Sequence, residues 1–327
     1  MDAGRSRAGR RLGVTASALG LALVGACTGS AATPSPASPT TTSPAAVSGS
    51  TTSSAPTSSA PTTATPTAAA SITVTLPGAG PRRWSLAQLL ALPRTTVTAA
   101  DGSTVTAPTL ATLTRYAGPA RTGSPDSRLL VVYRVSGTGT GAAMTFTRAE
   151  TEASVGDHPA LITLTAAGRL DVVVPQDRTT GRSVLGVDAV DVRVVEVPAA
   201  PSPVPAPGSV EVDAGSSHRT VDVASLPRRD YALTRPGSAT TRQQGARLAD
   251  VLTAAGLSLD DATLVTVVGS TGQVAVLTGG EVREAQKEVG LSLAQDGRSL
   301  PRPQLVVGGD VGPARTVTSV TRVVVGS

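Results

Sequence analysis

Apolar residues recur along the chain in two patterns, one typical of strands and one typical of short helices. Residues 190–197 alternate valines with polar positions such as Arg193 and Glu196. A period of two predicts a strand with one buried face, formed here by Val192, Val194 and Val197. Residues 246–256 instead space their apolar side chains along one face of a short helix, which a glycine ends.

The predicted elements occur twice in the same order, which indicates two copies of one folding unit. Each copy has an opening strand, a turn or short helix ending in Leu-Pro-Arg, an amphipathic helix, further strands, a second short helical segment and closing strands. The matched segments are 72–76 with 209–213, 84–94 with 221–228, 109–118 with 246–256, 129–135 with 263–268, 148–150 with 280–282, 170–175 with 305–310, and 190–197 with 320–325. The predicted fold class is therefore α+β and β-rich, in two tandem domains.

Proline-rich stretches divide the chain into parts. Residues 28–70 are nearly all Thr, Ser, Pro and Ala and carry no charge, so they cannot bury enough apolar surface to fold. A second proline-rich break covers residues 198–207. We expect a leader over 1–26, a disordered tether over 27–70, a first domain over 71–198, a linker over 199–208 and a second domain over 209–327.

The first 26 residues have the pattern of an export signal. Four arginines among residues 5–11 precede an apolar run at 12–26, shorter than the about 20 residues of a spanning helix. The run ends in Leu-Val-Gly-Ala before Cys27 and resembles the bacterial lipobox. The resemblance implies cleavage before Cys27 and a lipid on its thiol, which anchors the chain to the outer face of the cytoplasmic membrane. The alternative is that Cys27 is an ordinary small residue of a conventional leader.

Composition narrows the classes of function. Cys27 is the only cysteine, so the chain forms no internal disulfide and, once lipidated, has no thiolate for catalysis or metal binding. The formal charge of +5 includes the four leader arginines, so the mature chain is near neutral. Its cationic residues are scattered, Lys287 is the only lysine, and aromatic residues make up 2% of the chain. We therefore expect no nucleic-acid binding.

Four motifs of the second copy together resemble a known domain. They are Gly-Ala-Arg-Leu-Ala-Asp-Val-Leu at 245–252, Asp-Gly-Arg-Ser-Leu-Pro at 296–301, Leu-Val-Val-Gly-Gly-Asp at 305–310 and the closing strand at 315–325. This order is similar to that of the molybdopterin-binding domain of sulfite-oxidase-type oxidoreductases. The first copy keeps less of it, namely Ala-Ala-Gly-Arg at 166–169, Val-Val-Val-Pro-Gln-Asp at 172–177 and Gly-Val-Asp-Ala-Val-Asp-Val at 186–192.

The resemblance implies a molybdenum site, but this chain lacks the cysteine that the family uses to bind the metal. The family holds molybdenum through a cysteine just upstream of the first helix, and the corresponding segments 95–102 and 231–238 contain none. Asp101 or Ser238 would be a hard oxygen ligand and would make a different site. We therefore expect the fold without the metal chemistry and no bound cofactor, with molybdopterin as the alternative.

The remaining candidates have simple structural explanations. His158 and His218 fall in predicted loops of different copies, which favours solvated side chains over a metal site or a catalytic triad. The glycines of residues 137–141 follow one predicted strand and precede another, which indicates a hairpin turn and not a phosphate loop.

Charged pairs and the single tryptophan also have structural explanations. Asp260-Asp261 and Arg228-Arg229 are predicted to be solvated turn charges. Trp84 is predicted to cover the core.

Two hypotheses about function remain. The first is a non-catalytic module of the cell envelope that binds a small ligand or an envelope protein. The second is an oxidoreductase component that binds molybdopterin, with the metal held by a group other than cysteine or completed by a partner subunit. The missing thiolate favours the first hypothesis.

Overall fold

The computed structural model describes residues 70–117, 129–139, 143–179, 181–233, 239–284 and 288–326. All of these residues belong to one compact unit. Within this described part of the chain, no helix has the length and hydropathy needed to span a bilayer. The predicted leader and tether, with Cys27, lie outside the described residues, as does Ser238.

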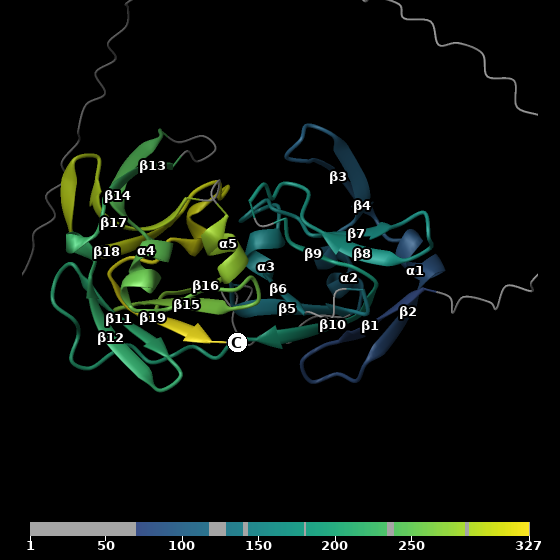
Figure 1. Cartoon of the computed structure of the whole chain (residues 1–327), viewed down its shortest axis with the longest axis horizontal. Helices are drawn as coiled ribbons and strands as arrows, with labels where there is room; N and C mark the ends of the chain where they lie inside the picture. The colour runs from purple at the N-terminus through teal and green to yellow at the C-terminus, as the bar shows by residue number, and fades with distance from the viewer. Residues whose placement is uncertain are drawn as a thin grey trace, which may run out of the picture. The chain divides into compact units, whose positions relative to one another are not determined.

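The N-terminal half (residues 70–194) and the C-terminal half (residues 209–326) each contain a five-stranded sheet of the same topology (Figure 1). The sheet order is β2-β1-β10-β5-β6 in the first and β12-β11-β19-β15-β16 in the second. In each sheet one pair is parallel, β1 with β10 and β11 with β19, and the other pairs are antiparallel. The strands are β1 (Ser71–Thr75), β2 (Arg82–Ser85), β5 (Val131–Gly137), β6 (Met144–Thr147), β10 (Val187–Val194), β11 (Ser209–Ala214), β12 (Ser217–Asp222), β15 (Leu264–Gly269), β16 (Val274–Thr278) and β19 (Val320–Gly326).

Each half has further strands on the other side of its core. The C-terminal half has one four-stranded sheet of order β13-β14-β17-β18, whereas the N-terminal half has the pair β3-β4 and the triple β7-β8-β9. A single bridge between Thr109 and Leu161 connects these two N-terminal sheets. The strands are β3 (Arg94–Thr98), β4 (Thr104–Pro108), β7 (Leu161–Leu164), β8 (Leu170–Val173), β9 (Ser183–Val184), β13 (Arg229–Leu233), β14 (Thr241–Arg247), β17 (Val289–Gln295) and β18 (Arg298–Val307).

The helices are short and occupy matching places in the two halves. α2 and α4 follow β4 and β14, and α3 and α5 follow β6 and β16. Figure 1 shows α3 and α5 where the two halves meet, beside β6 and β16, which are in contact. The helices are α1 (Leu86–Leu90), α2 (Leu110–Ala117), α3 (Arg148–Thr151), α4 (Leu248–Ala254) and α5 (Gly279–Arg283), with 3-10 turns η2 (Val223–Ser225) and η3 (Pro313–Arg315).

Aliphatic side chains build a separate core in each half. In α4, Leu248, Val251 and Leu252 are buried, and they pack with valines of the central strands such as Val323. β-branched valines suit a pleated surface that is covered on one side. The helix of residues 246–256 is confirmed as α4, whose last turn leads to Gly256 at φ +79°. The described part of the chain is β-rich with five short helices, as the α+β prediction required.

One detail of the sequence prediction was wrong. The strand predicted at 190–197 leaves its sheet at Val194, so Val194 and Val197 are exposed although Val192 is buried. The turn or helix predicted within 221–228 is confirmed as the 3-10 turn η2, but it begins two residues later than expected, because Val221 still pairs with Val210 of β11. In both places pairing with the neighbouring strand decides where the strand ends.

Candidate functional site

A threonine begins each of the two helices at the junction of the halves. Thr147 Oγ1 accepts a hydrogen bond from the Glu150 amide at 3.0 Å, and Thr278 Oγ1 accepts one from the Glu281 amide at 3.1 Å. Such N-caps satisfy a backbone donor that the helix itself leaves free. The caps also fix the position of the third residue of each helix, which is Glu150 in α3 and Glu281 in α5. Both glutamates are fully buried.

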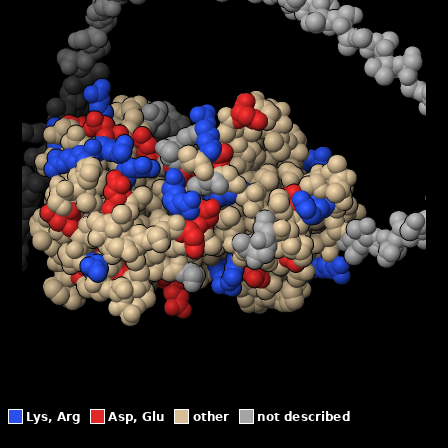
Figure 2. Space-filling model, in the orientation of Figure 1, with Lys and Arg blue, Asp and Glu red and all other residues tan. Residues whose placement is uncertain are grey.

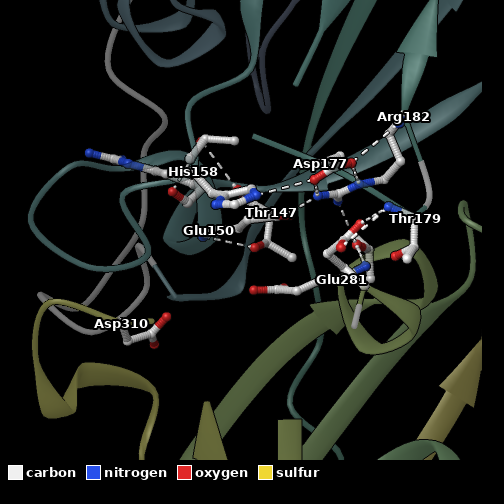
Figure 3. A network of polar contacts seen from close by, with 12 residues as sticks. Thr147, Glu150, His158, Asp177, Thr179, Arg182, Glu281 and Asp310 are labelled. Carbon is white, nitrogen blue, oxygen red and sulfur yellow. Dashed lines mark hydrogen bonds and ion pairs between the residues drawn. The ribbon is translucent and has the colours of Figure 1, made fainter. Parts of the chain in front are cut away.

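The buried Glu150 faces an equally buried arginine. Arg182 Nη2 donates to Glu150, and Arg182 Nε donates to Asp177 Oδ2 at 2.7 Å. Figure 3 shows Asp177 lying between Arg182 and His158. Burial alone would lower the pKa of Arg182, but Glu150 and Asp177 outweigh it and hold that pKa well above its ordinary value. Arg182 is therefore a permanent buried cation.

The C-terminal half repeats this network. Arg315 Nη1 donates to Glu281 Oε1 at 2.5 Å, and Arg315 Nε donates to Asp310 Oδ2 at 2.8 Å. Burial opposes the charge of Arg315 as well, yet Glu281 and Asp310 raise its pKa. In each half the aspartate precedes the arginine by five residues, and the glutamate follows its capping threonine by three.

Hydrogen bonds from this region cross between the halves. Arg182 Nη1 donates to Thr278 Oγ1 at 3.3 Å, and the Thr179 amide donates to Glu284 Oε2 at 3.1 Å. Gly280 lies directly against the Arg182 side chain, where a Cβ would overlap it. The arginine network of the N-terminal half thus also fixes how α5 packs.

A pocket of about 530 Å³ lies in the N-terminal half, next to this network. Its walls come from β3, α2, the end of α3 with the segment that follows it, and Gln176. The lining residues are Pro93, Thr95, Thr96, Val97, Thr98, Thr109, Ala111, Thr112, Arg115, Thr151, Glu152, Ala153, Asp157, Pro159 and Gln176. Its volume is within the range of small-molecule sites.

The buried network positions one wall of the pocket. His158 stands between the lining residues Asp157 and Pro159, and its Nε2 lies 3.2 Å from Asp177 Oδ1. The His158 amide also donates to the Glu150 carbonyl at 3.0 Å. The prediction that His158 is solvated was wrong, since only 12% of its side chain is exposed. Sequence alone gave no sign that a loop histidine would meet a buried carboxylate 19 residues away.

One polar atom of the lining is buried without a partner. Gln176 Oε1 has no hydrogen-bond partner in the structure and is shielded from solvent. An unmade hydrogen bond at a buried group costs about 1–3 kcal/mol. Gln176 lines the pocket and directly precedes the network residue Asp177, but its Oε1 is itself not accessible from the pocket.

Of the two oxygen candidates for molybdenum, only Asp101 lies among the described residues. Asp101 lies in the exposed β3–β4 turn, where the Ser103 hydroxyl and amide donate to Oδ1 at 2.7 and 2.9 Å and lower the pKa of Asp101. Within the described ranges, no group of three or more His, Asp or Glu side chains could hold a metal ion. The lining of the pocket carries two carboxylates, Glu152 and Asp157, and one guanidinium, Arg115, a balance of charge that does not suit the phosphate of a molybdopterin.

The histidine and carboxylate predictions in the C-terminal half have mixed outcomes. His218 was expected in a loop but lies on strand β12, exposed, with Nδ1 2.6 Å from Asp213 Oδ1. Asp260 caps a turn, because the Thr263 amide and hydroxyl both donate to its Oδ1 at 2.7 Å. Asp261 forms an ion pair with Arg283 at 3.0 Å.

The other predictions agree with the structure where it describes them, apart from one position. β5 and β6 pair antiparallel around residues 137–141, as the hairpin prediction required, although 140–142 lie outside the described residues. Arg228 and Arg229 are exposed as predicted, but Arg229 begins strand β13 and does not lie in a turn. Trp84 is confirmed as part of the core, with Arg82 stacked over its ring at 5.1 Å.

Sequence reasoning missed the two buried arginine networks. The signal was present as Thr-x-x-Glu at 147–150 and 278–281, followed by Asp-x-x-x-x-Arg at 177–182 and 310–315. Thr-x-x-Glu is a recognisable helix start. The same two motifs in the same order in both copies indicate a shared structural role, which neither copy alone reveals.

Comparisons with known proteins found only weak structural similarity. No family model matches it, and no curated protein matches it. Among solved structures, the sulfane dehydrogenase SoxCD from Paracoccus pantotrophus is similar at 14% identity and a TM-score of 0.29, over 36% of this chain and 37% of that chain. The similarity is weak, and this chain spans little more than a third of the length of that protein.

Replacing Arg182 with methionine tests the buried network. We expect Arg182→Met to lower the free energy of unfolding by about 3–5 kcal/mol, because Glu150 and Asp177 then lose their cation inside the protein. The control Arg83→Met should change it by less than about 1 kcal/mol, since Arg83 is exposed and its Nε donates to Ser71 Oγ at the surface. Urea denaturation of the three proteins measures both values, and equal effects would contradict this role of Arg182.

Proposed function

We propose that the described part of the chain is a binding module for a small molecule, which it receives in the pocket between β3, α2 and the segment after α3. The observation that carries this proposal is the pocket of about 530 Å³, one wall of which is held by the buried ion pairs of Arg182. Its volume is within the range of small-molecule sites. Most of the lining residues are polar or charged, six of them threonines, so the pocket suits a polar small molecule.

The rigid surroundings of the pocket support the same function. Glu150, Asp177 and Arg182 hold the segments that carry Thr151, Asp157 and Gln176. A binding site whose walls are fixed before the ligand arrives loses less entropy on binding. The buried charges next to the pocket therefore preorganise its walls for binding.

We further propose that the module is held at the outer face of the cytoplasmic membrane by a lipid on Cys27. The apolar run and the lipobox-like residues before Cys27 support this, as does the uncharged Thr/Ser/Pro/Ala-rich tether that follows. A single acyl chain gives only marginal membrane binding, whereas several chains anchor a protein stably. The tether would keep the binding module clear of the membrane surface.

Removing the thiol tests the anchor. In its native host, Cys27→Ala should abolish incorporation of a labelled fatty acid and leave the leader attached, so the product keeps residues 1–26. Thr28→Ala is the matched control and should be lipidated like the unchanged chain. Intact-mass analysis of the membrane fraction measures both effects, and normal lipidation of Cys27→Ala would contradict the proposal.

Filling the pocket tests the binding function. We screen the full chain by thermal unfolding against neutral polyols, amino acids, amines and phosphates, and expect one class to raise the melting temperature. Ala153→Trp places a large side chain in the pocket and should abolish that rise. Ala87→Trp is the control, because Ala87 is an exposed residue of α1 outside the lining, and it should keep the rise.

Two results would contradict the binding function. One is that no compound of any class stabilises the unchanged chain. The other is that Ala153→Trp responds as strongly as Ala87→Trp, which would place binding elsewhere.

A further inference from the structure

We propose that strand β12 is a self-association surface, through which two copies of this chain pair edge to edge. This goes beyond the proposed binding function and does not depend on it, because β12 belongs to the C-terminal half and the pocket to the N-terminal half. Three features of β12 support the proposal: its open backbone, its contrast with β2, and the register in which two copies fit.

β12 is the last strand on one side of its five-stranded sheet (Figure 1). Among the described residues only β11 pairs with it, and five of its six residues are exposed. An edge strand presents a row of amides and carbonyls that a further strand can join. The outer side of β12 therefore offers a template for pairing with another extended segment.

The backbone groups that point outward follow from the hairpin that β11 and β12 form. A two-residue turn joins the strands, so its closing pair, Ala214 with Ser217, is a hydrogen-bonded pair. The same alternation holds at the other end, where the Val223 amide donates to the Gly208 carbonyl at 2.9 Å. Backbone direction alternates along a strand, so every second residue of β12 faces away from β11. These residues are His218, Thr220 and Asp222.

The strand in the same place of the N-terminal half, β2, is protected against such pairing. β2 has only four residues, follows Pro81 and begins with Arg82 and Arg83. Short length, proline and charge are features by which proteins prevent edge-to-edge association. β12 has six residues, contains no proline and has Arg219 as its one arginine. Figure 2 likewise shows few charged groups at the lower left, over β11 and β12.

One antiparallel register satisfies the outward groups of both copies. With a two-fold axis at Thr220, Thr220 lies opposite Thr220 of the second copy, and His218 lies opposite Asp222. All of the outward amides and carbonyls of these residues then face a partner. The two copies keep the same face toward their cores, so the two five-stranded sheets become one continuous sheet.

The charges of β12 favour this register over its neighbours. It sets the imidazole of His218 opposite the carboxylate of Asp222, and no like charges oppose each other. Moving the axis to Arg219 sets two guanidinium groups opposite each other, which destabilises a sheet. Moving it to Val221 sets His218 opposite Ala224, which lies in the 3-10 turn η2 and cannot continue the strand.

Cross-linking through a single cysteine tests the register in the full chain. Thr220→Cys should form a disulfide-linked dimer on mild oxidation, because Cα atoms of such a pair lie about 5.5 Å apart, within disulfide range. Ser217→Cys is the matched control on the same strand, also exposed. Its two copies would lie about 20 Å apart, so it should give no more dimer than the unchanged chain, which carries Cys27.

Sedimentation equilibrium over a range of protein concentrations tests the association itself. We expect the unchanged chain to form a dimer, and Thr220→Lys to raise its dissociation constant about fivefold or more, because two ammonium groups then oppose each other on the axis. Ser217→Lys adds the same charge outside the paired residues and should dimerise like the unchanged chain. Both positions are exposed, so neither variant should lower the melting temperature.

Each outcome has a defined meaning. A dimer that Thr220→Lys weakens and Ser217→Lys does not supports the proposal, as does a cross-link of Thr220→Cys alone. An unchanged chain that stays monomeric at every concentration overturns it. Equal behaviour of the two lysine variants, or of the two cysteine variants, places any contact elsewhere and also overturns it. None of these results bears on the pocket, whose binding function is judged by the thermal screen.

Discussion

Two buried guanidinium groups constrain this structure more than any other feature. Arg182 and Arg315 are almost fully shielded from solvent, and each stays charged only because a glutamate and an aspartate contact it. Taking an ion out of water costs several kcal/mol unless partners of good geometry replace the water. The threonine caps, the helix starts and the loops that carry the aspartates must therefore be in place together.

The shape of the pocket depends on the buried ion pairs of Arg182. Asp177 contacts Arg182 on one side and His158 on the other, and both neighbours of His158 line the pocket. Gln176, which carries the unpartnered oxygen, is adjacent to Asp177 in sequence. Because Arg182 also bonds Thr278 of the C-terminal half, the same side chains fix the pocket wall and the contact between the halves. The C-terminal half is thus part of what preorganises a site built in the N-terminal half.

Local patterns in the sequence predicted most of the secondary structure. Alternating valines and the spacing of residues 246–256 gave strands and the helix α4, because those patterns depend on near neighbours and on one buried face. The misplaced strand end at Val194 and the later start of the turn after Asp222 both came where pairing with distant strands decides the outcome. The shared order of elements in the two halves was visible because the chain carries it twice.

The candidate site was much less accessible to sequence reasoning. Its charged residues come from segments far apart in the chain, and single charges between apolar runs resemble solvated turns. His158 was misjudged for this reason, since its partner Asp177 lies on another loop. Only the double occurrence of Thr-x-x-Glu and Asp-x-x-x-x-Arg could have revealed the networks in advance. The unpartnered oxygen of Gln176 depends on packing and has no counterpart in the sequence.

The central claim is that this fold serves binding without molybdenum chemistry. Elemental analysis of the full chain purified from its native host, together with pterin fluorescence after oxidation, tests it most directly. The account predicts a folded protein with neither molybdenum nor tungsten in stoichiometric amount and no pterin. Stoichiometric metal with pterin would contradict it and would require a metal ligand other than cysteine.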